Sequence, residues 1–186
     1  MSRDSTDAGG AESASYTNSG TVALTVFVII DTSQNQAGSF TIAATVDTPA
    51  ADEVCEGATP LTSGTVVTGT TVGYVNDYQS GTNCRGTLGP DRVYSIEVAA
   101  GATLATTATP TGTPWDVSLN LVVGPAANCS PTQRTCAAAA SQGGAGQPEA
   151  ATYHNTTANP QTVFIFVESP SPLGAGTFTL LATVTN

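Results

Sequence analysis

The side chains that could do chemistry in this chain are few, because it contains only four cysteines and one histidine. No two cysteines form a CxxC pair, and His154 alone adds too little for an ordinary zinc site. We therefore expect two disulfides, made by Cys55, Cys84, Cys129 and Cys136. Free buried thiols of a cytosolic protein are the alternative, but the cysteines lie in turn-like stretches such as NCRG and ANCSP.

The order of the cysteines suggests which of them pair. Proximity along the chain favours Cys55 with Cys84 and Cys129 with Cys136, although four cysteines allow three connectivities. On the loop-entropy model these closures would contribute roughly 3 to 4 and about 2.5 kcal/mol. Because disulfides persist in oxidising compartments, we expect an extracellular or cell-surface location.

Catalysis is not predicted for this chain. A Ser-His-Asp arrangement could use only His154, and the sequence contains neither a GxSxG elbow nor a lysine for a phosphate-binding loop. Paired carboxylates such as Asp52 and Glu53 occur in any acidic chain and are interpreted as a solvated loop.

The charge of the chain excludes two classes of partner. Fourteen acidic residues face four arginines and no lysine, which gives a net charge of -10. Binding to nucleic acid phosphates or to an anionic membrane surface is therefore not expected. No apolar run approaches the roughly 18 residues that span a bilayer. The N-terminal SRDSTDAGG lacks the basic start and apolar core of a secretion signal, so either a signal was removed or Met1 begins a cut fragment.

Short runs of alternating apolar and polar residues predict β-strands separated by Gly and Pro turns. Only 10% of the residues are charged, and no stretch of useful length shows an apolar period of 3.6 residues. Strands are expected within residues 64–77, 92–98, 101–109, 115–124, 162–169 and 177–184. Some eight strands over about 138 residues are typical of an all-β, antiparallel β-sandwich.

The C-terminal part of this pattern occurs twice. Residues 25–31 (TVFVIID) align with residues 162–168 (TVFIFVE), and Tyr16 aligns with Tyr153, both at an offset of 137 residues. After one extra residue in the second copy, the match resumes through a second strand. There, GSFTIAATV (38–46) aligns with GTFTLLATV (176–184). Self-similarity at a fixed offset is typical of tandem units.

The repeat predicts two domains. Residues 1–47 would be an N-terminal β-hairpin segment, either the two-strand end of a preceding repeat or a donor segment, and residues 48–186 would be a complete sandwich. Thr17 stands where the second copy has His154, which argues further against a catalytic histidine.

An isolated apolar hairpin is marginal in water, so its surface needs a cover. We expect the residues that mediate assembly to be Val26, Val28, Ile30 and Phe40. Three arrangements are open: the segment ends a preceding module, it packs onto its own downstream module, or it completes a neighbouring subunit by strand addition. Self-association or contact with neighbouring repeats is therefore expected.

The order of four stretches resembles a known family. GPDRVYSIEVAAGATL, WDVSLNLVVG, PEAATYHNTTANPQTVFIFVES and GAGTFTLLATV follow one another as in the bacterial pre-peptidase C-terminal (PPC) domain. The resemblance covers residues 91–184 well, residues 55–90 loosely, and residues 12–46 as the tail of a preceding copy. It implies a jelly-roll-like sandwich that is appended to or repeated within secreted proteins and is usually not catalytic.

Calcium is the one cofactor that the resemblance implies, since members of this family sometimes bind it through acidic loop residues. The candidates here are Asp77, Asp91 and Asp116, together with Asp52 and Glu53. Arg92 stands where a second acid is common in the family, and a guanidinium beside a cation site argues against one. Turn carboxylates that cap backbone amides are the alternative.

Aromatic residues raise the prospect of glycan binding. Trp115 precedes a predicted strand, and a plug between two sheets is favoured over a sugar-stacking platform. Tyr74 and Tyr78 are expected to be exposed in a loop, where they could line a glycan or partner site.

Two functions fit these observations. The first is a non-catalytic extracellular structural or adhesive module, forming a bacterial surface filament or tandem array by strand addition through residues 1–47. The second is an accessory domain of a secreted hydrolase that binds calcium, a glycan or the parent enzyme.

Overall fold

The computed structural model describes residues 10, 14, 16, 23–31, 38–46, 50–78, 81–130 and 133–186. The chain divides into two units, Met1–Val46 and Asp47–Asn186, which are described separately.

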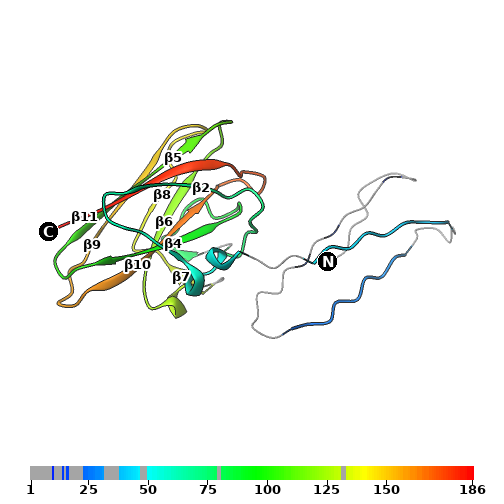
Figure 1. Ribbon diagram of the computed structural model, residues 1–186, viewed down its shortest axis with the longest axis horizontal. Helices are drawn as coiled ribbons and strands as arrows, with labels where there is room; N and C mark the ends of the chain where they lie inside the picture. The colour runs from blue at the N-terminus through cyan, green and yellow to red at the C-terminus, as the bar shows by residue number, and fades with distance from the viewer. Residues whose placement is uncertain are drawn as a thin grey trace. The chain divides into compact units, whose positions relative to one another are not determined.

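Strands, turns and short 3-10 helices make up the second unit (Figure 1). The 3-10 helices are η2 (Ala51–Glu53), η3 (Cys55–Gly57) and η4 (Ala126–Asn128). The strands are β1 (Thr59–Pro60), β2 (Val66–Thr70), β3 (Gly81–Thr82), β4 (Arg92–Val98), β5 (Thr103–Thr111), β6 (Ser118–Val123), β7 (Arg134–Thr135), β8 (Ala138–Ala140), β9 (Glu149–His154), β10 (Gln161–Glu168) and β11 (Thr177–Thr185).

Two larger sheets organise these strands. The β10 sheet has the order β1-β4-β10-β6-β8, and the β11 sheet has the order β2-β11-β5-β9. The long ladders are antiparallel, whereas β1 with β4 and β3 with β7 make short parallel pairs. β10 and β11 follow each other in the chain but lie in different sheets, each with a neighbour on both sides. The predicted all-β antiparallel sandwich is confirmed.

The main core lies between the two sheets. Alternate residues of β11 and β5 point into it, among them Phe178, Leu180 and Leu104, because successive side chains of a strand point to opposite faces. Trp115 is also buried there, and its indole N–H donates to the carbonyl of Thr177 at 2.9 Å. The predicted plug between the sheets therefore describes Trp115 correctly.

A second apolar cluster covers the other face of the β10 sheet. Phe164 and Phe166 of β10 pack with Val93 and Val122 of the neighbouring strands. Tyr78 joins this cluster from the loops that cover this face of the sheet, which we call the loop layer. Tyr78 packs edge-on against Phe166, with ring centroids 4.8 Å apart. The expectation that Tyr78 is exposed is wrong, because loops close over this face of the sheet.

The two disulfides staple this loop layer. The four cysteines lie among the described residues and pair as Cys55–Cys129 and Cys84–Cys136, across 74 and 52 residues. The pairing by proximity in the sequence is wrong. Parallel pairing of β3 with β7 places Cys84 beside Cys136, whose N–H donates to the carbonyl of Thr82 at 2.9 Å.

The described stretches of the first unit are rich in apolar residues. Its described stretches, 23–31 and 38–46, carry no assigned strand and are exposed to solvent along their whole length. The predicted hairpin is therefore not formed as a paired ladder in these described stretches. A strand is part of a sheet only where its backbone has a hydrogen-bonded neighbour.

Candidate functional site

Acidic side chains gather where η2 meets the loop that follows β2. Asp52 accepts hydrogen bonds from the hydroxyls of Thr59 and Tyr74, each at 2.9 Å, and forms an ion pair with Arg92 at 2.8 Å. Burial acts to raise the pKa of Asp52, but these hydrogen bonds and the Arg92 charge outweigh it and leave that pKa lowered. Asp52 is thus an ionised and fully engaged carboxylate.

Arg92 is held in place by more than its ion pair. Its guanidinium carbon lies 5.4 Å from the ring centre of Tyr74 and 5.2 Å from that of Tyr94. Contact with two aromatic faces favours a cation at this position. The Asp52 end of the acidic group is therefore neutralised by the protein itself.

Glu53 and Asp91 are more deeply buried and less completely bonded. Glu53 Oε1 accepts from the Val75 N–H at 3.0 Å, and Asp91 Oδ2 accepts from the N–H groups of Asp77 and Tyr78 at 3.1 and 3.3 Å. The second oxygens, Glu53 Oε2 and Asp91 Oδ1, are buried with no hydrogen-bond partner among the described residues. Such oxygens favour a bound proton or a cation over an open negative charge.

The pKa directions agree with this geometry. Burial raises the pKa of Glu53, and the nearby charges of Asp77 and Asp52 raise it further. Burial also raises the pKa of Asp77. For Asp91, burial and then the charge of Glu168 raise the pKa, against an opposing effect of Arg134. The neutral acid is therefore favoured at Asp91.

The structure brings together some of the predicted metal ligands and not others. The N–H of Asp77 donates to Asp91, so these two residues are neighbours. Asp116 lies near a different acid, since burial and then the charge of Glu149 raise its pKa. Over the described part of the chain, no group of three or more His, Cys, Asp or Glu side chains is arranged to hold a metal. The structure therefore places Asp77 beside Asp91, but within the described residues it assembles no complete set of calcium ligands from the predicted acids.

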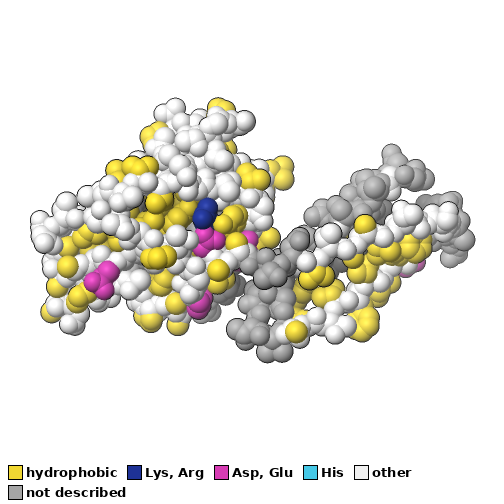
Figure 2. All heavy atoms as spheres, in the orientation of Figure 1, with side chains coloured by type: hydrophobic (Ala, Val, Ile, Leu, Met, Phe, Trp, Pro, Cys, Tyr) yellow, Lys and Arg dark blue, Asp and Glu magenta, His cyan; other side chains and the backbone are white. Residues whose placement is uncertain are grey.

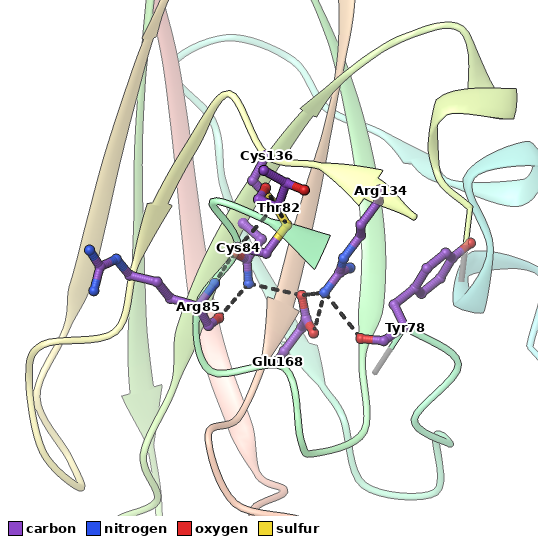
Figure 3. Close-up of a disulfide and its surroundings, with 8 residues drawn as sticks. Tyr78, Thr82, Cys84, Arg85, Arg134, Cys136 and Glu168 are labelled. Atoms are coloured by element: carbon purple, nitrogen blue, oxygen red, sulfur yellow. Dashed lines mark hydrogen bonds and ion pairs between the residues drawn. A yellow bond between two sulfur atoms is a disulfide. The ribbon is translucent and has the colours of Figure 1, made fainter. Parts of the chain in front are cut away.

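A buried ion pair lies beneath the loop layer that the two disulfides cross-link (Figure 3). Arg134 donates from Nη2 to both carboxylate oxygens of Glu168, at 2.8 and 2.9 Å, and both side chains are fully buried. Asn120 completes the network, since its Nδ2 donates to Glu168 Oε1 at 3.0 Å and to the carbonyl of Arg85 at 2.7 Å. The arrangement ties β6, β7 and β10 together.

Sequence reasoning did not identify this network. Arg134 lies in a polar stretch, TQRTC, which gives no sign of burial. The one available signal is the repeat, in which an acid ends the apolar run in both copies, as Asp31 and Glu168.

The other predicted site residues do not gather into one site. His154 is exposed at the end of β9, where its ring nitrogen is 3.1 Å from the Thr103 hydroxyl. Burial of Trp115 and Tyr78 removes both as stacking platforms for a sugar. Tyr74 is half-buried and contacts Asp52 and Arg92, so glycan binding stays a prediction. The predicted assembly residues Val26, Val28, Ile30 and Phe40 are all exposed, on an apolar surface visible in Figure 2.

Comparison with known proteins gives one structural neighbour of note. No family model and no curated protein matches the chain. The chain is similar to a solved structure, the pre-peptidase C-terminal domain of collagenase from Bacillus anthracis, at 17% identity and a TM-score of 0.43. The match covers 68% of this chain and 94% of that domain. Within the described residues, no helix is long and apolar enough to cross a bilayer.

Proposed function

We propose that this chain is a non-catalytic, extracellular structural module that associates with neighbouring modules through residues 1–47, as in a tandem array or filament. The exposed apolar surface of the first unit carries the proposal: Phe27 and Ile29 are 83% and 85% exposed. Contiguous apolar surface of this kind marks an interaction site in a soluble protein.

The second unit suits a structural role. Its sandwich is covered on one side by a loop layer that two disulfides staple, and a buried ion pair links that layer to β10. Disulfides of this kind are favoured in extracellular proteins. The buried carboxylates of Asp52, Glu53 and Asp91 accept hydrogen bonds from surrounding loop residues and do not line an open cleft.

Association through the first unit is testable by size-exclusion chromatography with light scattering. The chain is expected to form oligomers, whereas Phe27→Ser/Phe40→Ser should weaken association by about 10-fold or more, because two large apolar contacts are lost. Leu173→Ser is the matched control, since Leu173 is 94% exposed but lies in the second unit. A chain that stays monomeric at high concentration would contradict the proposal.

A second candidate function is that of a calcium-dependent accessory domain. The observation that favours it is that Glu53 Oε2 and Asp91 Oδ1 are both buried and have no hydrogen-bond partner among the described residues. Calcium prefers carboxylate oxygens, so a bound cation would offset the cost of burying these acids in their charged form.

Thermal unfolding in calcium and in chelator tests this candidate. At millimolar calcium, a site of the affinity usual for extracellular modules would add about 2 kcal/mol of stability. This corresponds to a rise in Tm of roughly 5 °C. Asp91→Asn should abolish the rise, whereas Asp116→Asn should leave it unchanged, because Asp116 lies away from the cluster. Equal Tm values with and without calcium would refute calcium binding.

A further inference from the structure

The second copy of the repeat shows where the residues of the first copy belong in a folded module. Residues 25–31 align with β10, which lies between β4 and β6, and residues 38–46 align with β11, which lies between β2 and β5. Both positions are central and lie in different sheets. A segment built for these positions needs four neighbouring strands, two in each sheet.

The same comparison shows that both faces of the first stretch need a cover. In β10, Ile165 points into the main core, whereas Phe164 and Phe166 point into the second apolar cluster, beneath the loop layer. The aligned residues of the first copy are Val28, Phe27 and Ile29, which are equally apolar. A simple sheet edge would cover neither face in this way.

Exposure separates the two copies sharply. Phe27 is 83% exposed where Phe164 is 6% exposed, and Phe40 is 65% exposed where Phe178 is fully buried. The two stretches carry side chains typical of a protein core, yet these side chains are exposed in the described part of the first unit.

A glycine gives independent evidence. Gly176 precedes β11, and a Cβ there would overlap the indole of Trp115, so only glycine fits. Gly38 is the aligned residue, yet no described atom lies within 4 Å of a Cβ built on it. The close approach that requires glycine at this position therefore exists in a complete module and not in the isolated unit.

We propose that residues 16–46 are the last two strands of a preceding module of this same kind, whose counterparts of β1 to β9 cover them. The proposal rests on the proposed function and specifies its partner. It differs from strand addition at an edge, because the two stretches insert into the middle of two sheets and beside a tryptophan equivalent to Trp115.

A tandem protein tests this partner directly. In it, a copy of residues 48–152 replaces residues 1–15, and residues 16–186 are unchanged. Hydrogen exchange of the amides in residues 23–31 and 38–46 is expected to be about 100-fold slower than in the chain itself. Exchange that stays as fast as in the chain would overturn the proposal.

Gly38→Val is the matched variant. In the tandem protein it should remove the protection, because the new side chain would overlap the upstream tryptophan. In the chain itself it should change nothing, because the space around Gly38 is open. Protection that is insensitive to this substitution would mean that copies of the chain cover one another face to face, and it would overturn the proposed partner.

A chimera provides a second test, which does not depend on the junction in the tandem protein. Here residues 153–184 of the full chain are replaced by a second copy of residues 16–46, with Glu retained at the position of Glu168. Cooperative unfolding of the second unit is expected, whereas the same replacement with stretches 23–31 and 38–46 exchanged in order should not fold. If both fail while the chain still oligomerises through Phe27 and Phe40, the partner is wrong and the proposed function stands.

Discussion

Arg134→Met is expected to lower the free energy of unfolding by about 3 to 5 kcal/mol, which is the usual cost of leaving one member of a buried ion pair alone. Arg134 and Glu168 are both fully buried, so water cannot replace the lost partner. The substitution also removes the contact of the guanidinium with the Phe166 ring, whose centre lies 4.5 Å from the guanidinium carbon. Urea unfolding followed by tryptophan fluorescence measures the change.

The double variant Arg134→Met/Glu168→Leu separates the pair from its surroundings. Because both buried charges disappear together, it should lose less stability than either single variant. Arg85→Met is the matched control: Arg85 is exposed, and Asn120 binds only its backbone, so the change should stay within about 0.5 kcal/mol. Additive losses in the double variant would show that the ion pair is not coupled.

The strands that dominate the fold could be predicted from their sequence. The stretches DRVYSIEVAA and TVFIFVE form β4 and β10. Alternation indicates a strand in the first, and short length with β-branched and aromatic residues indicates one in the second. Within residues 64–77, where strand structure is expected, the one strand is β2 in the first half. The second half instead forms the loop that binds Glu53 and Asp91.

Burial on the second face of the β10 sheet could not be predicted. In β6 the polar residues Ser118 and Asn120 alternate with Leu119 and Leu121, a pattern typical of a half-exposed strand. All four are buried, because loops far away in the sequence close over the polar side. The alternation of apolar and polar residues identifies a strand, but it does not show whether loops cover the polar face of the sheet.

The candidate site was predicted in part. Asp77 and Asp91 do meet, since the loop before β4 folds back on the segment after β2, while Asp116 lies elsewhere. The buried guanidinium of Arg134 gave no local signal, because its burial follows from the two-residue pairing of β3 with β7. Contacts between such short elements depend on the whole fold.

The disulfide pairing has the second large expected effect. Closing loops of 52 and 74 residues contributes about 4 kcal/mol each on the loop-entropy model. Cys84→Ser/Cys136→Ser should therefore lose about 4 kcal/mol of unfolding free energy and keep the Cys55–Cys129 bond. Thiol titration of the denatured variant should find no free cysteine.

Cys55→Ser/Cys84→Ser also removes two cysteines, one from each disulfide of the structure. It should lose about 8 kcal/mol, which is comparable to the whole stability of an ordinary domain, and leave Cys129 and Cys136 without their native partners. Pairing by proximity in the sequence predicts the opposite order, because this variant would then lose one bond and Cys84→Ser/Cys136→Ser would lose both. The ranking of the two variants thus decides between the connectivities, since both carry the same number of serine substitutions.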